Sequence, residues 1–375
     1  MKIKLKENIQ IEADENTLEA IVRKCTYQNP KYSEAERMGR SVRTIDPLIH
    51  LSNETENGLS VPIGMLNKLL KQYPNAQVTD QRQTVKALIP FKGDLRPYQR
   101  QFVDDAVDAQ SGAMLAATGA GKTIAAIALA SHLKQRTLVL VKSKDLAIQW
   151  HDQIKHFTGC NAGLVGNGKN IEGEQFTVGL IQTLSKLDMS KLNYGLVIAD
   201  ECHNLPANQA FKVVNGINCK YKYGLTATLQ RRDNMEFMIR AAIGEIAAEV
   251  KQEQLENKVL PVKIRFIEHD FYERVTFVSW SDYINIIAYD ETRNEMIIEE
   301  VVMSCYKKPT IILCSTVKHC EILTELADYE SLNPLLIHGQ LPAKVRQNHI
   351  NKAHNSSLII GTSQLLSEGC VYWRW

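Results

Sequence analysis

Residues 112–123 read GAMLAATGAGKT and are followed by the apolar, helix-forming run IAAIALASHL (124–133). The first half has the length and apolar character of a buried strand. The second half is a glycine loop that ends in Lys122 and Thr123. Such a loop between a strand and a helix can present a nest of backbone N–H groups, to which the helix N-terminus adds positive potential. The stretch therefore predicts a phosphate-binding P-loop in an α/β fold.

The residues of this loop have separate expected roles. Gly119 and Gly121 let the backbone approach a phosphate group closely, Lys122 would reach the β- and γ-phosphates of ATP, and Thr123 would ligate Mg²⁺. The usual first glycine of the motif is Ala116 here, so an ordinary glycine-rich turn between strand and helix is the alternative interpretation. The full set expected around the nucleotide phosphates is Thr118, Gly119, Ala120, Gly121, Lys122 and Thr123.

A second apolar run, LVIADECH (196–203), ends in two adjacent carboxylates. Open α/β sheets bind ligands at the carboxyl ends of their strands. Asp200 is expected to hold Mg²⁺, and Glu201 is expected to act as the base that orients the attacking water. An acid pair at a strand end is often only solvated. In the same α/β block as the P-loop, however, it predicts an ATP-hydrolysing site.

The order of apolar runs predicts the fold class. From Leu95 onward, runs with little polar alternation are separated by helix-length segments, as in a doubly wound parallel sheet. Residues 240–300 have a less regular pattern, and a second α/β series begins at 310. The runs expected to be strands are 112–118, 136–143, 176–183, 194–201 and 222–228 in the first series, and 310–316, 334–339 and 357–363 in the second.

Composition excludes several classes of protein. With 44% hydrophobic and 23% charged residues in a chain of 375, a disordered chain, a collagen-like fibre and a coiled-coil rod are all excluded. No apolar run approaches 18 residues, so no membrane span is expected. A net charge of +2 means that any DNA binding would depend on local basic patches. The eight cysteines lack CxxC or zinc-finger spacing and predict reduced thiols in the cytoplasm.

The motifs occur in the order found in superfamily 2 helicases. DECH (200–203) resembles a DEAD/DEAH box. Further resemblances, in chain order, are LRPYQRQFV (95–103), LVLVKSKDLAIQW (138–150), VGLIQTL (178–184), GLTATLQRRD (224–233), LLIHGQL (335–341) and IIGTSQLLSEG (359–369). Within the superfamily the chain resembles the UvsW/XPB-like group, which includes phage helicases. The resemblance implies tandem RecA-like P-loop lobes, the second incomplete, after a small α+β N-terminal domain, with boundaries at 1–88, 89–245 and 246–375.

The same resemblance assigns roles to further residues. Gln99 would read the adenine edge, and His203 would join Lys122, Asp200 and Glu201 as a catalytic group. Thr226 and Thr228 would couple the ATP site to DNA, although a polar strand end that satisfies its own backbone is the alternative. The candidate DNA contacts are Gln182, Thr183 and Thr362 in the lobes and Arg37 and Arg40 in the basic, aromatic segment 29–65, where a solvated helical face is the alternative.

These observations predict an ATP-dependent DNA helicase or translocase that uses ATP and Mg²⁺. Its expected partner is branched or single-stranded DNA, recognised with little sequence specificity because the contacts go to phosphates. A monomer in the cytoplasm is favoured. Two alternatives stay open, namely a DNA-translocating motor subunit of a restriction or repair assembly, and a module that binds nucleotide and DNA without cycling.

The end of the sequence departs from the family pattern. After Gly369 the chain reads CVYWRW (370–375), with Val371 where the family has an aspartate. The arginine-bearing Q-x-x-G-R-x-x-R-type motif does not follow. We therefore expect a truncated second lobe and an impaired motor, because losing an arginine finger costs on the order of 10³–10⁵ in rate.

Two other patterns are assigned no chemistry. GLVGNGKN (163–170) predicts a β-turn between two flanking segments. His338, which precedes Gly339, is predicted to be a packed histidine at a strand end.

Overall fold

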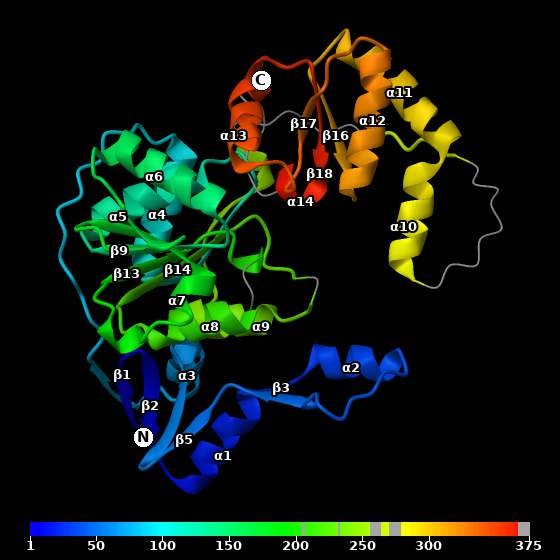
Figure 1. The fold of residues 1–375 in the computed structure, drawn as a ribbon. Helices are drawn as coiled ribbons and strands as arrows, with labels where there is room; N and C mark the ends of the chain where they lie inside the picture. Colours follow the sequence, from blue (N-terminus) through cyan, green and yellow to red (C-terminus); the bar gives the residue numbers. More distant parts are fainter. Residues whose placement is uncertain (205–206, 232, 256–263, 270–278, 367–375) are drawn as a thin grey trace. The chain divides into compact units, whose positions relative to one another are not determined.

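The computed structural model describes residues 1–204, 207–231, 233–255, 264–269 and 279–366 (Figure 1). Its internal contacts group into two compact units, Met1–Pro261 and Val262–Trp375. The three-part division expected from the sequence, with boundaries after residues 88 and 245, remains a prediction.

The chain begins with a five-stranded sheet in the order β5-β6-β2-β1-β7. Residues alternate along its central strands, so that Ile3, Leu5, Ile9 and Ile11 are buried while Lys2 and Lys4 face outward. Helices α1 (Glu15–Lys24) and α3 (Leu66–Gln72) contribute Ile21 and Leu69 to the same core. The strands are β1 (Lys2–Leu5), β2 (Asn8–Glu12), β5 (Asn53–Thr55), β6 (Gly58–Pro62) and β7 (Gln77–Asp80).

The sequence VPIGMLNKLLKQY (61–73) has the pattern of an amphipathic helix, but the helix in the structure is shorter than this pattern predicts. Strand β6 extends to Pro62, which pairs with Asn8 of β2 and has extended backbone angles (φ −61°, ψ 146°). A 3₁₀ turn (Ile63–Met65) follows, and α3 begins only at Leu66. A separate ribbon of β3 (Thr26–Gln28) and β4 (Leu48–His50) flanks α2 (Pro30–Arg37) in sequence.

The larger sheet has eight strands in the order β11-β10-β12-β9-β13-β14-β8-β15 (Figure 1). Every neighbouring pair is parallel except β10 and β11. Strands β9 and β13 are buried along their whole length, as the apolar runs predicted. The strands are β8 (Ser111–Ala116), β9 (Thr137–Val141), β10 (Gly163–Gly166), β11 (Lys169–Ile171), β12 (Phe176–Leu180), β13 (Leu196–Ala199), β14 (Tyr221–Thr226) and β15 (Ile246–Val250).

Helices cover both faces of this sheet. Val139 and Ile198 pack with α4 (Pro97–Ala109), α5 (Lys122–Leu133) and α6 (Lys144–Thr158) on one face. Leu138 and Val197, one residue earlier on each strand, pack on the opposite face. That second face is covered by α7 (Ile181–Leu184), α8 (Ala207–Gly216) and α9 (Glu236–Ile243), as Figure 1 shows. The predicted doubly wound sheet is confirmed.

The two sheets of the first unit share a core at α9. Met235, Met238 and Ala241 pack with the buried residues of the N-terminal sheet. The 3₁₀ turn lies against the end of the helix so closely that a Cβ on Gly64 would be 2.3 Å from the carbonyl oxygen of Arg240. The buried Lys222 adds a polar link, because its Nζ donates to the carbonyls of Val214 (2.7 Å) and Glu7 (3.2 Å).

The second unit contains a parallel three-stranded sheet in the order β16-β18-β17. Its strands coincide with the runs expected from the sequence. Helices α11 and α12 supply Ile298, Val301, Cys320 and Leu323 to its core. The elements are α10 (Trp280–Tyr289), α11 (Glu291–Cys305), β16 (Thr310–Cys314), α12 (Val317–Tyr329), β17 (Leu335–Ile337), α13 (Ala343–Lys352), a 3₁₀ turn (Ala353–Asn355), β18 (Leu358–Thr362) and α14 (Ser363–Leu366).

The expectation of a less regular stretch over residues 240–300 is wrong for much of its length. Within it lie the end of α9, strand β15, helix α10 and the first part of α11. Asp290 separates the last two and caps α11, since its side chain accepts the N–H of Arg293 at 2.8 Å. This capping aspartate is a helix-start signal that the sequence pattern contained.

Two smaller expectations can also be checked. The turn in residues 163–170 is confirmed, because β10 and β11 form a hairpin in which Asn167 and Gly168 both have positive φ. His338 is buried just beyond β17, as expected for a packed histidine. Across the described ranges, none of the helices has the length and apolar character needed to cross a membrane.

Candidate active site

The glycine loop connects the end of β8 at Ala116 to the start of α5 at Lys122, as the sequence predicted. Gly119 and Gly121 both have φ +84°, a conformation that favours glycine. Gly121 also lacks room for a side chain, because a Cβ there would lie 2.3 Å from Gln99 Nε2. The loop geometry thus depends on glycine at 121 for both conformation and space.

Helix α4 holds the loop through one carbonyl. Tyr98 Oη and Gln99 Nε2 both donate to the carbonyl oxygen of Ala120, at 3.1 and 2.9 Å. Gln99 Oε1 accepts the backbone N–H of Arg96 at 3.0 Å, which closes a capping box at the start of α4. In the structure Gln99 is therefore a buried brace for the phosphate loop. Its expected contact with adenine stays a prediction.

Lys122 points into the site from the first turn of α5. Its Nζ donates to the carbonyl of Ala116 at 3.1 Å and lies 3.7 Å from Glu201 Oε1. The side chain is largely buried. Thr123, the next residue of α5, is half-buried. The expected phosphate-binding lysine and the expected catalytic base are thus within ion-pair distance of each other.

Asp200 is buried at the end of β13, and two donors hold its carboxylate. Trp150 Nε1 donates to Oδ2 at 2.7 Å, and the backbone N–H of Glu201 donates to Oδ1 at 3.0 Å. Burial raises the pKa of Asp200 to about 6, and the Trp150 hydrogen bond opposes that rise. Trp150 lies within one of the motif strings, but sequence reasoning gave it no role. An indole next to a carboxylate 50 positions away leaves no sequence signal.

The oxygen donors of this site fit Mg²⁺. Asp200 supplies a buried carboxylate, and the hydroxyl of Thr123 is the type of second ligand that this ion takes. Within the described ranges, no group of three or more His, Cys, Asp or Glu side chains could hold a metal ion. Mg²⁺ is usually bound through one or two carboxylates together with substrate phosphates and water.

Glu201 has a backbone conformation that is unusual for its residue type. Its φ is +41°, in the left-handed region, directly after Asp200. Non-glycine residues in this region are strained and concentrate at functional sites. The side chain is about one-third exposed and lies 3.4 Å from His203 Nδ1. The turn therefore directs an accessible carboxylate to the centre of the site.

His203 connects this turn to the end of β14. The hydroxyl of Thr226 accepts the backbone N–H of Thr228 and also contacts the carbonyl of Thr228 and His203 Nδ1, the last at 2.6 Å. A hydroxyl has a single hydrogen, so all three contacts are satisfied only when His203 carries its proton on Nδ1. Burial lowers the pKa of His203, which favours the neutral ring.

Arg231 adds a second link between the same two segments. Its Nη1 donates to the carbonyl of His203 at 2.5 Å, while Nε and Nη2 form a two-pronged pair with Asp233 at 2.8 Å each. Hydrogen bonding to Arg231 lowers the pKa of Asp233. Both residues lie within the motif string GLTATLQRRD (224–233), but no role was predicted for either of them. The local sequence signal for this ion pair is the spacing, since an aspartate follows the arginine by two residues.

The expected site residues thus fall into two sets. Lys122, Glu201, His203, Thr226 and Thr228 form one connected network, with Asp200 and Gln99 adjacent to it. The candidate DNA contacts lie outside this network. On α7, Gln182 is exposed and Thr183 is half-buried. Arg37 at the end of α2 and Arg40 just after it are exposed, and Thr362 lies at the end of β18 in the second unit. Residues 367–369 of the last motif string and the terminal 370–375 lie outside the described residues.

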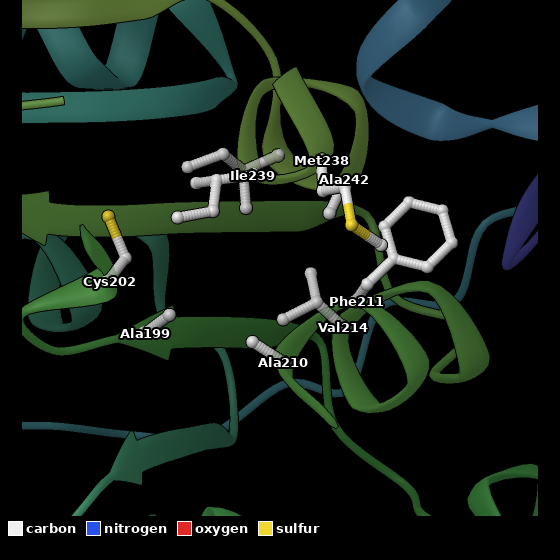
Figure 2. A pocket seen from close by; sticks show the side chains of 9 residues that line it. Ala199, Cys202, Ala210, Phe211, Val214, Met238, Ile239 and Ala242 are labelled. Atoms are coloured by element: carbon white, nitrogen blue, oxygen red, sulfur yellow. The ribbon is translucent and has the colours of Figure 1, made fainter. Parts of the chain in front are cut away.

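A small apolar cavity of about 10 Å³ lies behind the DECH turn. Figure 2 shows Cys202 and Ala199 at one side, with Met238, Ile239 and Ala242 of α9 and Phe211 and Val214 of α8 around the rest. Burial raises the pKa of the Cys202 thiol to about 12. The cysteine of DECH is therefore a packing residue that seats the turn on α8 and α9, without a nucleophilic role.

Known proteins resemble the chain in this region. Residues 92–231, from just before α4 through Arg231, match the family model described as type III restriction enzyme, res subunit. Over 283 residues the chain is 26% identical to a putative DNA 3′-5′ helicase Rad25 of Halobacterium salinarum, covering 71% of this chain and 45% of the relative. Over 129 residues it is 36% identical to a probable helicase of Escherichia phage T5, covering 34% of this chain and 28% of the relative.

These matches support a superfamily 2 helicase close to the UvsW/XPB-like group. The crystal structure of UvsW from bacteriophage T4 matches 96% of this chain and 80% of that one, with a TM-score of 0.50 and 18% identity. At that identity the likeness concerns the fold, and it confirms the predicted α/β class with tandem RecA-like lobes. The chain spans about half the length of the curated relatives it matches.

Proposed function

We propose that the chain is an ATP-dependent DNA helicase or translocase. The observation that carries the proposal is the connected network from the P-loop lysine through Glu201 and His203 to Thr226. A phosphate-binding loop alone would serve any nucleotide-binding protein. A base in contact with a histidine that is hydrogen-bonded to another strand end is the arrangement that a coupled motor needs. Relatives named as DNA 3′-5′ helicases support the choice of DNA.

Each residue has a defined part in the proposed reaction. The backbone N–H groups of the glycine loop and Lys122 hold the ATP phosphates. Asp200 and Thr123 would hold Mg²⁺, which when bound neutralises phosphate charge. Glu201 takes a proton from the attacking water at its carboxylate, within reach of the neutral His203. The first unit of the chain thus supplies the groups for binding, orientation and proton transfer.

The finer assignments rest on the same proposal. Gln182, Thr183 and Thr362, together with Arg37 and Arg40, would contact DNA phosphates, which gives little sequence specificity. We expect branched or single-stranded DNA to be the substrate, in replication, recombination or repair. We expect a monomer that acts in the cytoplasm, where free thiols such as those of the seven described cysteines stay reduced.

A second candidate is a DNA-translocating subunit of a restriction assembly. The family model that matches residues 92–231 carries that description in its printed name. A third is a module that binds nucleotide and DNA without turnover. All three use the same nucleotide site, so sequence around the P-loop does not separate them.

The test is to measure ATP binding, ATP hydrolysis and strand separation by the full chain with single-stranded, forked and four-way-junction DNA. We expect hydrolysis stimulated by DNA, with strand separation. Glu201→Gln should lower turnover by at least about 10²-fold while ATP binding persists, because only the base is lost. Lys122→Ala should lose both.

Each outcome selects one candidate. DNA-stimulated hydrolysis without strand separation would favour the translocating subunit. Binding of ATP and DNA without turnover would favour the non-cycling module. Hydrolysis that is indifferent to DNA and unchanged in Glu201→Gln would contradict the proposal itself.

A further inference from the structure

Trp150 is the one indole placed against the proposed metal-binding carboxylate in the described part of the chain. It lies on the buried face of α6, together with Leu146, Ala147, Ile154 and Thr158. The ring belongs to the same buried core as Val139 and Ile198, and its surface is 1% exposed. A buried indole N–H needs an acceptor, and here it donates to Asp200 Oδ2 at 2.7 Å.

We propose that Trp150 is a positioning residue for Mg²⁺ binding, which orients the Asp200 carboxylate through its indole N–H. This inference rests on the proposed function, since it assigns a role within the same nucleotide site. A group that donates a hydrogen bond to a metal ligand orients that ligand, and losing such a group typically weakens metal binding 10- to 100-fold.

The chemistry of the donor supports the role. Indole is neutral and donates only one hydrogen bond, so it fixes the carboxylate plane without neutralising its charge. An arginine or lysine in its place would form an ion pair and compete with the metal ion for that charge. The second donor, the Glu201 N–H on Oδ1, comes from the backbone. Each oxygen therefore accepts one fixed, uncharged donor and retains a lone pair for a cation.

Position in the fold supports the role as well. Asp200 ends β13, whereas Trp150 belongs to the helix after β9, the strand next to β13 in the sheet. The hydrogen bond therefore ties the carboxylate to a rigid neighbouring layer. The strained turn at Glu201, with its positive φ, begins at the next residue. Without the indole, the Asp200 carboxylate would lose the hydrogen bond to Oδ2 and keep the one from the Glu201 backbone N–H to Oδ1.

The experiment measures binding of a fluorescent ATP analogue by the full chain, at a series of Mg²⁺ concentrations and in EDTA. Trp150→Phe keeps an aromatic ring but removes the N–H. We expect the Mg²⁺ concentration for half-maximal enhancement of binding to rise at least about tenfold, with affinity in EDTA within about twofold of the unsubstituted chain. If Trp150 had only a structural role, its substitution would change the Mg²⁺ dependence and the affinity in EDTA together, or would change neither.

Tyr223→Phe is the matched control. Tyr223 is also fully buried in this core, and its hydroxyl donates to the carbonyl of Ala106 at 2.7 Å, away from the site. It should leave the Mg²⁺ dependence unchanged. If Trp150→Phe does not fold, a benzothienylalanine at position 150 keeps the bicyclic shape and replaces the N–H by sulfur.

The two hypotheses fail in different ways. An unsubstituted chain without Mg²⁺-dependent ATP binding would overturn the proposed function and this inference with it. A normal unsubstituted chain, with the same Mg²⁺ dependence in the position-150 variant, would overturn the inference alone.

Discussion

Glu201 is the residue on which the proposed chemistry converges. Its carboxylate lies between Lys122 Nζ at 3.7 Å and His203 Nδ1 at 3.4 Å, and its φ of +41° directs it there. The neutral, Nδ1-protonated ring of His203 then leads to the hydroxyl of Thr226. A change at the carboxylate can therefore reach the end of β14 through two hydrogen-bonded side chains, without any movement of the sheet.

Thr226→Val should separate basal from DNA-stimulated ATP hydrolysis. The variant keeps the branched shape but removes the hydroxyl that meets His203 and the Thr228 N–H. We expect basal turnover within about threefold of normal, because the proposed base Glu201, whose assistance is typically worth a factor of about 10²–10⁴, is left intact. Most of the stimulation by DNA should be lost, because the link from His203 to the end of β14 is removed. Steady-state ATPase with and without single-stranded DNA measures both.

Thr324→Val is a suitable control, because that hydroxyl only returns to the Cys320 carbonyl within α12. Equal DNA stimulation in Thr226→Val and the unsubstituted chain would exclude the coupling role.

A buried pair of polar side chains, His319 on α12 and Asn294 on α11, is expected to make the stability of the second unit depend on pH. His319 Nε2 lies 2.9 Å from Asn294 Oδ1, and Asn294 Nδ2 donates to the carbonyl of Ala288. The amide oxygen is therefore an acceptor, which requires an N–H on His319 Nε2. Burial, with a smaller contribution from Arg293, lowers the pKa of His319 to about 4.

The stability of the second unit should fall as the solution is acidified. With a folded-state pKa near 4 against the ordinary 6.5 of histidine, the unfolded chain binds the proton more readily between these values. The contribution is thus complete above pH 6.5 and is lost as pH falls toward 4, by no more than about 3 kcal/mol. Hydrogen exchange of the backbone amides of this unit at pH 7.5 and pH 5.0 measures the change in its free energy of unfolding.

In His319→Gln the pH dependence should shrink, because glutamine keeps a donor but does not titrate. His132→Gln, at an exposed position of α5, should retain it. A His319→Gln chain that loses stability with acid as steeply as the unsubstituted one would show that other groups are responsible.

At the scale of the whole molecule, the N-terminal sheet and the P-loop lobe are joined through α9. That helix follows directly after the Arg231–Asp233 pair, and it faces the N-terminal core with Met235, Met238 and Ala241. Ile239 and Ala242 of the same helix, together with Met238, line the cavity behind the DECH turn (Figure 2). One helix thus packs against both the expected DNA-recognition region and the segment that carries the proposed base.

Removing residues 1–80 should therefore destabilise the P-loop lobe. The deletion would expose the α9 methionines and leave Lys222 Nζ without the Glu7 carbonyl, and a buried cation with a lost partner is costly. We expect a lower unfolding temperature and self-association, measured by circular dichroism and light scattering. Substituting Met235 and Met238 with glutamine should restore solubility to the fragment. A soluble fragment with an unchanged unfolding temperature would show that the two sheets are independent.

Sequence by itself determined the strand–loop–helix order around Lys122, the acid pair after β13 and the α/β class. These features are local, because glycine conformation, capping and buried apolar runs act over a few residues. The sequence pattern did not predict the described helices within residues 240–300, where α10 and α11 share the boundary residue Asp290.

Tertiary structure alone decided which side chains complete the site. Trp150 meets Asp200 across 50 positions, and Arg231 meets the His203 carbonyl across 28. Only the strand order, with β9 beside β13 and β13 beside β14, brings these pairs together. The same holds for the shared core at α9, since a pattern of apolar residues shows that a helix buries one face but does not identify the partner that covers it.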